Sequence, residues 1–265
     1  MRTRVGEDSE RNLEAQIEGH LISWGVPREL AAGLAEYHTK LTYAPGESIF
    51  GQNSPADILF WVVKGIVKES CPIPGGTEVV VRLAAPGDIL GIAGELNQAG
   101  QWTRRFEARA VTKCVLAIVT REHLRKTLKS LGRDTLAEVC ERMNSAWAGW
   151  VQYYAVFLGL GFRARLELVL AELGRKFGVP DSDGILLTYE PSHGDLAEMI
   201  GSSRPMVSRI MAELIAERQI ARRGPRYILL NSGPIAAAAA AKSRPLAPLS
   251  NAITIVPGNR GTAAA

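Results

Sequence analysis

The chain has 265 residues, of which 46% are hydrophobic and 22% charged, and its formal net charge is +4. This composition is that of a globular protein with a sizeable core, and the mild basic excess permits a nucleic-acid partner without demonstrating one. Three cysteines, Cys71, Cys114 and Cys140, lie far apart, which excludes a disulfide framework and a zinc-finger spacing. Because the sequence shows neither an apolar signal core nor a bilayer-length apolar stretch, we expect a cytoplasmic protein with no membrane partner.

Residues 1–40 are predicted to form short helices ahead of the main body of the chain. Apolar residues recur at helical spacing between Asn12 and Trp24, and a second helix is expected from Arg28 to Tyr37. In residues 41–130, short runs rich in Val, Ile, Leu and Phe alternate with glycine and proline turns. Short strands at this even spacing are typical of an all-β barrel or jelly roll, so we expect a β-roll here.

Residues 131–160 are predicted to form one long helix that pairs with a second copy of the chain. Apolar positions along it step alternately by four and three, which is the spacing of a coiled-coil seam. The seam consists of Leu136, Cys140, Met143, Trp147, Trp150, Tyr154 and Phe157. One face of a buried core helix is the alternative, but polar residues on the other faces and the large aromatic side chains favour self-association.

Cys140 lies on this seam, so a parallel dimer would bring its two copies close together. An interchain disulfide or redox switch is therefore one hypothesis, and a small buried apolar residue is the alternative.

Residues 161–231 have the layout of a winged helix-turn-helix. Ser192 can cap a short helix with Asp195 reaching back to it, and Gly201 supplies the turn before a second helix. The segment Ile220–Leu230 then gives two short strands about a Gly-Pro turn, which form the wing.

Two further segments frame this unit. A helix from Phe162 to Phe177 is expected to open it, after glycines 159 and 161 break the long helix. The final segment, residues 232–265, is rich in alanine without periodic apolar positions, and we expect it to be disordered.

A recognition helix aims polar residues near its N-terminus at base edges. Arg204 is placed to reach a base edge, where guanidinium pairs bidentately with guanine, and the wing arginines suit the DNA backbone. The predicted DNA-contacting residues are Ser192, Ser202, Ser203, Arg204, Met206, Ser208, Arg209, Arg222, Arg223 and Arg226. Nearby acidic residues offset most of the positive charge of these arginines. Specific placement of the side chains in the DNA groove, and not net charge, must therefore account for the binding.

Three motifs together resemble the Crp/Fnr family of bacterial regulators over about Leu41 to Leu230. They are Tyr43–Glu47, Ala85–Gly91 and Gly201–Arg209. The resemblance implies a cyclic-nucleotide-binding-type β-roll, a homodimer through the central helix, palindromic operators and RNA polymerase as a partner. Many members have a glutamate directly after the recognition arginine, where this chain has Pro205, which puts the usual half-site preference in doubt.

In nucleotide-binding members of this family, a Gly-Glu pair and a downstream Arg-Ser pair hold the cyclic phosphate and ribose. Gly94, Glu95 and Arg104 match this pattern, but Arg105 replaces the small hydroxyl residue. On the central helix, Trp150 and Val151 occupy the positions of the Thr-Ser pair that holds the base. The resemblance therefore leaves two alternatives: an anion bound at Arg104 and Arg105, or an ion pair of Glu95 with one of these arginines in a collapsed pocket.

The sequence does not support the other cofactors considered for this chain. An iron–sulfur cluster needs four cysteines and is not expected, and the four histidines offer no obvious haem ligand pair. Cyclic AMP is doubtful because of the replacements just described, so the effector is unknown. The sequence offers no candidate metal ligands or catalytic residues, because it lacks a nucleophile–base set, a metal cluster and a phosphate-binding loop.

Together these features predict an α+β chain with an N-terminal β-roll, a long central dimerisation helix and a C-terminal winged helix-turn-helix. The predicted function is that of a transcription regulator, not an enzyme, that binds specific double-stranded DNA sequences as a homodimer. The alternative is a small-molecule-binding module that senses cyclic nucleotides and for which DNA binding is secondary.

Overall fold

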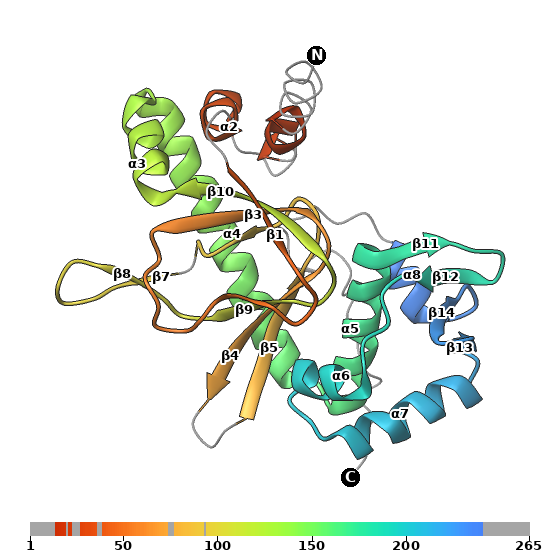
Figure 1. The fold of residues 1–265 in the computed structure, drawn as a ribbon. Coiled ribbons are helices and arrows are strands. Elements are labelled where there is room, and N and C mark those ends of the chain that lie inside the picture. Colours follow the sequence, from red (N-terminus) through yellow and green to blue (C-terminus); the bar gives the residue numbers. More distant parts are fainter. Residues whose placement is uncertain are drawn as a thin grey trace, which may run out of the picture.

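The computed structural model describes residues 14–19, 21–22, 27–35, 39–73, 77–92 and 94–240. Figure 1 shows a central β-roll, the long helix α4 running past it, and a C-terminal unit of helices around a small sheet. This arrangement confirms the predicted α+β class. The predicted tail beyond residue 240 lies outside the described residues.

Two four-stranded antiparallel sheets make up the β-roll, with strand orders β1-β10-β3-β6 and β2-β9-β4-β5. A separate hairpin, β7–β8, extends from one side (Figure 1). Side chains from both sheets, among them Phe50, Phe60 and Leu116, form the core between them. The strands are β1 (Thr39–Tyr43), β2 (Ser48–Phe50), β3 (Ile58–Lys64), β4 (Val67–Ile73), β5 (Thr77–Ala84), β6 (Ile89–Leu90), β7 (Gly94–Leu96), β8 (Trp102–Arg104), β9 (Glu107–Ala110) and β10 (Cys114–Thr120).

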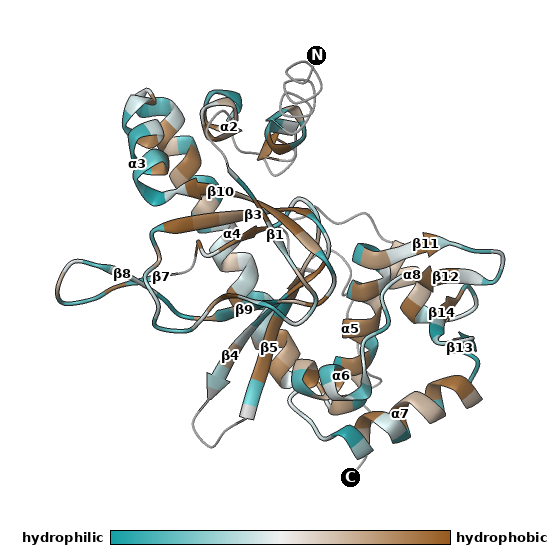
Figure 2. Cartoon of the chain, viewed as in Figure 1, coloured by the Kyte–Doolittle hydropathy of each residue, from teal (hydrophilic) through white to brown (hydrophobic). Residues whose placement is uncertain are grey.

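The N-terminal helices cover the outer face of the first sheet. Residues 14–19 and 21–22 are helical, and α2 spans Arg28–Ala35. Ile17 and Leu21 pack with Trp61 of β3 and Ala117 of β10. Strand β3 is therefore buried on both faces, and Figure 2 shows it as one of the most hydrophobic segments.

Helix α3 (Arg121–Ser130) leads into α4 (Arg133–Gly159), as the sequence predicts for the long helix. Part of the predicted seam is open to solvent in the single chain: Leu136, Met143 and Trp147 are 40%, 62% and 70% exposed. Cys140 is exposed between them and is a free thiol. Exposed large apolar side chains at this density are unusual on a monomer surface.

The predicted seam is wrong at its C-terminal end. Phe157 is only 9% exposed and belongs to the chain's own C-terminal core. Tyr154 is half-buried, and its hydroxyl donates to the carbonyl oxygen of Val81 at 3.3 Å. A straight helix drifts about 20° per heptad against a 3.5-residue repeat, so the exposed stripe continues instead at Val151 and Leu158.

The C-terminal unit combines helices with the four-stranded sheet β11-β12-β14-β13. Its elements are α5 (Phe162–Phe177), β11 (Gly178–Pro180), β12 (Gly184–Leu187), α6 (His193–Ile200), α7 (Arg204–Ala216), β13 (Ile220–Arg223), β14 (Arg226–Leu230) and α8 (Pro234–Ala240). One hydrophobic core joins α5, α6, α7 and the sheet, and Leu83 of β5 also reaches into it.

Helix α8 corrects the prediction that the chain is disordered from residue 232. Its Ile235, Ala236 and Ala239 are buried, and α8 packs against α5. A Cβ on Gly174 of α5 would lie 2.9 Å from the Ala239 Cβ. Alanine is the best helix former, and here small side chains allow close packing, so the segment needs no periodic pattern of large apolar residues.

Arg165 of α5 joins the end of α4 to the helix-turn-helix. Its guanidinium donates to the carbonyl oxygens of Phe157 (3.0 Å), Leu158 (2.9 Å) and Leu160 (2.9 Å) at the C-terminal end of α4. It also donates to the carbonyl oxygen of Ile200, the last residue of α6, at 3.2 Å. One cation thus satisfies carbonyls that two helix ends leave unpaired.

No described helix is long and apolar enough to span a membrane.

Candidate nucleic-acid interface

The turn between α6 and α7 forms as predicted, through local hydrogen bonds. Ser192 caps α6 in a complete capping box with Asp195, and Gly201 takes the left-handed conformation (φ 66°) that ends the helix. Ser203 caps α7 by accepting from the Met206 amide, and Pro205 lies in the first turn, where proline is tolerated. These caps fix where the second helix begins.

Helix α7 has a buried face and an exposed face. Val207, Ile210, Met211 and Leu214 are buried against the core. Arg204, Ser208 and Arg209 are exposed, and Arg204 forms no hydrogen bond or ion pair with any described residue. We therefore call α7 the recognition helix, since its solvent side carries the polar groups that a DNA groove requires.

Several of the predicted contact residues interact with other residues of the chain, among them Met206 and Arg223. Met206 is half-buried against the core, and its sulfur accepts from the Arg209 guanidinium at 3.0 Å. Arg223 of the wing is paired with Asp181 at 2.6 Å and Asp183 at 2.7 Å. Arg223 thus ties the wing to the β11–β12 turn through two ion pairs, although its side chain is 48% exposed.

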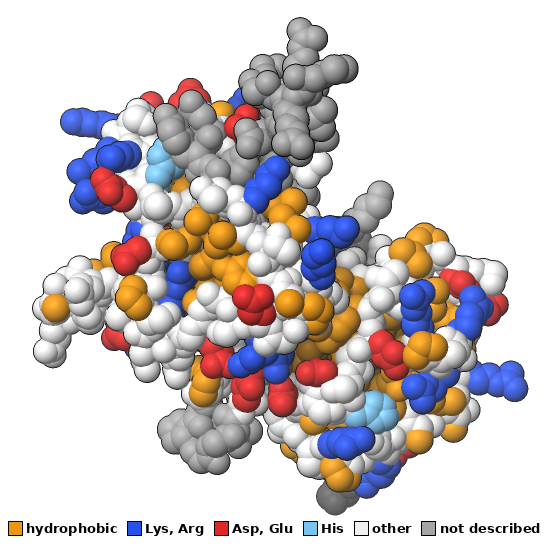
Figure 3. Space-filling view, viewed as in Figure 1, with side chains coloured by type: hydrophobic (Ala, Val, Ile, Leu, Met, Phe, Trp, Pro, Cys, Tyr) orange, Lys and Arg blue, Asp and Glu red, His pale blue; other side chains and the backbone are white. Residues whose placement is uncertain are grey.

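The other two wing arginines, Arg222 and Arg226, are exposed as well. Arg222 stacks over the ring of Tyr227 at 5.2 Å and lies 3.7 Å from Glu190. Arg226 is exposed next to Gly224, whose positive φ of 60° makes the tight turn between β13 and β14. Figure 3 shows Lys and Arg side chains around a histidine on the face that α7 and the wing form.

His193, the first residue of α6, is not among the predicted site residues. Its Nδ1 lies 2.8 Å from the Ser208 hydroxyl on α7, and its Nε2 lies 3.0 Å from the Tyr227 hydroxyl on β14. Burial, then the charges of Arg222 and Arg204, lower the pKa of His193 below its ordinary value of 6.5. The sequence gives no local indication of this role, because Ser208 and Tyr227 lie 15 and 34 residues from His193 along the chain.

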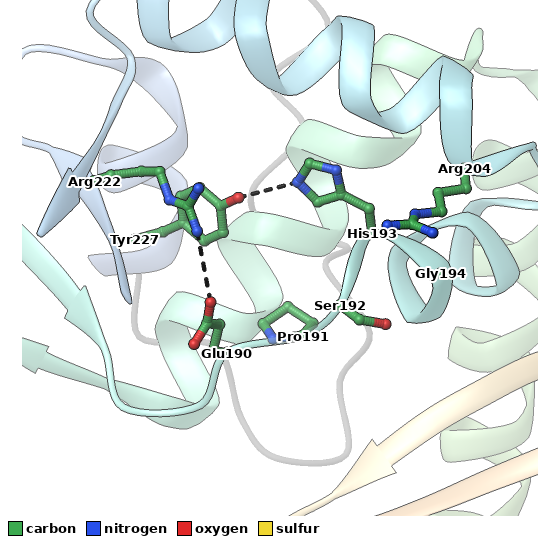
Figure 4. Close-up of a pocket in the computed structure, with 8 residues that line it drawn as sticks. All are labelled: Glu190, Pro191, Ser192, His193, Gly194, Arg204, Arg222 and Tyr227. Carbon is green, nitrogen blue, oxygen red and sulfur yellow. Dashed lines mark hydrogen bonds and ion pairs between the residues drawn. The ribbon is translucent and has the colours of Figure 1, made fainter. Parts of the chain in front are cut away.

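An open pocket of about 460 Å³ surrounds His193 (Figure 4). Arg204 lies on one side of it and Arg222 with Tyr227 on the other. The pocket is lined by Glu190, Pro191, Ser192, His193, Gly194, Arg204, Arg222 and Tyr227. Two guanidinium groups and a helix N-terminus face this space, which favours an anion such as a phosphate of the DNA backbone.

Only some of the residues predicted to form an effector pocket contact one another. Gly94 pairs with Arg104 across the β7–β8 hairpin. Glu95 forms an ion pair with Arg105 at 2.9 Å, both side chains being at least half exposed. Trp150 stacks on Tyr154 of its own helix at 5.8 Å. Of the two alternatives from the sequence, the structure therefore contains the Glu95 ion pair, and it involves Arg105.

Arg104 is buried inside the roll, with 2% of its surface exposed. Its guanidinium stacks over Phe50 at 4.2 Å and donates to the carbonyl oxygens of Gly91 (3.2 Å) and Ile58 (2.5 Å). Burial, followed by the charge of Arg121, lowers the pKa of Arg104 to about 10. With Arg104 turned inward and Arg105 paired to Glu95, these residues do not fit the cyclic phosphate that the family resemblance implies.

Comparison with protein-family models gives two matches. The cyclic nucleotide-binding domain matches residues 40–130, and the Crp-like helix-turn-helix domain matches residues 164–233. Among the described residues, no group of histidine, cysteine and acidic side chains could hold a metal ion.

Known relatives and solved structures agree with these matches. The global nitrogen regulator of Synechococcus elongatus is 31% identical over 206 residues, covering 77% of this chain and 90% of that protein. The CRP-like cAMP-activated global transcriptional regulator of Mycobacterium tuberculosis is 22% identical and covers 81% and 94%. The FixK2 structure from Bradyrhizobium japonicum shares the fold with a TM-score of 0.62 at 20% identity, covering 78% of this chain and all of that one.

The matched relatives are transcription regulators, which confirms the prediction that the chain is not an enzyme. A sensory domain of the cyclic nucleotide-binding type, a Crp-like helix-turn-helix and a relative above 30% identity all point to one conclusion. The chain belongs to the Crp/Fnr family of DNA-binding transcription regulators.

Proposed function

We propose that this chain acts as a homodimer on palindromic operators, with α7 and the wing of each subunit on one half-site. The observation that carries this proposal is the exposed polar face of α7, with Arg204, Ser208 and Arg209 next to the wing arginine Arg222. Arg204 reads a base edge, and Arg222 contacts the DNA backbone. The chain works in the cytoplasm and acts on RNA polymerase at the promoters it regulates.

The apolar stripe on α4 supports the dimer. Leu136, Met143 and Trp147 are together too large and too exposed for an isolated helix face. In such a dimer the two recognition helices must lie about one DNA turn apart, roughly 34 Å, to match two-fold related half-sites. A change in the β-roll that rotates α4 would alter this spacing and hence the affinity for the operator.

The effector of the β-roll is a separate question. One relative is named as cAMP-activated, but in this chain Arg104 is buried on Phe50 and Arg105 is paired with Glu95. We propose that cyclic AMP is not the signal. Nucleotide sensing as the principal activity would require tight binding in isothermal titration with cyclic AMP, cyclic GMP or cyclic di-GMP.

DNA selected from a random pool by the full-length chain tests the reading face. Arg204→Ala is expected to lose discrimination among the selected sequences, by about 1–3 kcal/mol at one position. Arg222→Ala should weaken binding to all of them alike and reduce the salt dependence. Unchanged gel shifts for both variants would remove α7 and the wing as the reading face.

Sedimentation tests the dimer. Trp147→Glu should give a monomer, because it places a charge in the apolar stripe, whereas Arg142→Glu on a polar face of α4 is the matched control and should remain a dimer. A dimeric Trp147→Glu variant would contradict the assigned interface.

A further inference from the structure

The imidazole of His193 joins the recognition helix to the wing. Ser208 of α7 contacts Nδ1 at 2.8 Å, and Tyr227 of β14 contacts Nε2 at 3.0 Å. Figure 4 shows the ring and the Tyr227 hydroxyl pointing toward each other across the pocket. Both ring nitrogens are thus paired with hydroxyl groups, which can donate as well as accept.

The charge of the ring decides where the two hydroxyl hydrogens point. A neutral imidazole has one donor and one acceptor nitrogen, so one of the two hydroxyls must donate its hydrogen to the ring. An imidazolium donates from both nitrogens, so both hydroxyls accept and their hydrogens turn elsewhere. Ser208 is exposed on α7 and Tyr227 lines the pocket, so these hydrogens become donors for a phosphate.

The charged groups around the ring come from each element packed on it. Arg204 belongs to α7 and Arg222 to β13, and both disfavour the imidazolium. Glu190, in the segment before α6, lies 3.7 Å from Arg222. Asp195 of α6 is occupied by the Ser192 cap. In the free protein, burial and then the charges of Arg222 and Arg204 keep the pKa of His193 low.

A DNA phosphate bound at Arg222 in this pocket, with Arg204 on a base edge, opposes these effects. The phosphate offsets the charge of Arg222 and attracts the imidazolium, as nearby anions do for any histidine. We propose that His193 takes up a proton when the chain binds DNA, so that the affinity for DNA rises as the pH falls. The proposal rests on the proposed DNA-binding function and adds His193 as a positioning residue that also senses pH.

Fluorescence anisotropy tests the proposal, with the full-length chain and a selected DNA duplex at fixed ionic strength between pH 5.5 and 8. The association constant of the wild-type chain is expected to rise several-fold over this range as the pH falls. Uptake of one proton by each subunit, two for the dimer, limits the slope to about a hundredfold per pH unit. His193→Gln keeps a polar side chain that does not titrate, and it should bind with little dependence on pH.

A matched control uses the other described histidine that is away from this face. His123 of α3 contacts the carbonyl oxygen of Gly33 at 2.7 Å, and His123→Gln should keep the wild-type slope. Thermal unfolding of each variant confirms that it is folded.

The outcomes separate the possibilities. A His193→Gln variant with the wild-type slope, or one that is weakened equally at every pH, would overturn the proton uptake while leaving DNA binding in place. A wild-type chain that selects no DNA at any pH would instead refute the proposed function on which this inference rests. Loss of the slope in His193→Gln alone supports the proposal.

Discussion

The ammonium group of Lys68, on strand β4 of the roll, lies 3.3 Å from the carboxylate of Glu198 on helix α6. Lys68 also pairs with Glu78 of β5 at 3.1 Å, and its side chain is only 16% exposed. Together with Lys176 of α5, which lies 3.2 Å from Asp88, this pair links the sensory roll directly to the DNA-binding unit of the same subunit.

The Lys68–Glu198 pair is expected to stabilise this docking measurably. In a double-mutant cycle of Lys68→Ala and Glu198→Ala, we expect a coupling energy of about 0.5–1 kcal/mol from chemical unfolding. Lys126→Ala with Glu122→Ala is the control, because this solvent-exposed pair within α3 should couple more weakly than Lys68 and Glu198. A coupling energy near zero for Lys68 and Glu198 would show that the two units are held by apolar contacts alone.

The buried guanidinium of Arg104 predicts a high cost for a methyl group on Gly91. A Cβ there would meet the Arg104 Nη1 at 1.8 Å, and the backbone has a positive φ of 79°. The left-handed conformation alone costs about 1–2 kcal/mol in Gly91→Ala, and displacing the guanidinium adds to it. We expect a loss of about 3 kcal/mol in the free energy of unfolding.

Gly100→Ala isolates the contribution of Arg104. Gly100 has a similar φ of 75°, and no atom lies within 4 Å of an added Cβ. The loss in the free energy of unfolding of Gly100→Ala should therefore come from the backbone conformation alone. If Gly91→Ala and Gly100→Ala destabilise the protein equally in thermal unfolding, the guanidinium moves away freely and is not a fixed part of the core.

His193 also makes the stability of the free protein depend on pH. Burial, then Arg222 and Arg204, lower its pKa in the folded state below 6.5, so below pH 6.5 the unfolded chain binds more protons. The stability is therefore fully present above pH 6.5 and is lost as the pH falls through and below this value.

His193→Gln should remove this part of the pH dependence in thermal unfolding between pH 5 and 7.5. The sign is opposite to that expected for DNA binding, where a lower pH strengthens the complex. A wild-type chain and a His193→Gln variant with parallel stability curves would contradict the buried, neutral imidazole.

The features that the sequence predicts well depend on neighbours along the chain. The cap of Ser192 with Asp195 and the left-handed Gly201 both arise from hydrogen bonds or torsions within about three residues. Residue identity alone therefore specifies them, and the bounds of α5 follow in the same way from its apolar spacing.

The features that the sequence did not predict depend on partners far along the chain. Arg223 is paired with Asp181 and Asp183, about forty residues away, and no local pattern distinguishes it from the exposed Arg226. Phe157 continues the heptad spacing but turns into the C-terminal core. The bridge through His193 requires α6, α7 and the wing to be folded together before its two partners meet.

The Arg165 guanidinium, bonded to carbonyl oxygens at the ends of α4 and α6, determines how a signal can travel. The same guanidinium therefore couples the end of α4 to the Gly201 turn, beside the packing of Phe157 in the C-terminal core. In the dimer that we propose, a rotation of α4 would be passed to the turn through Arg165 and would change the position of α7.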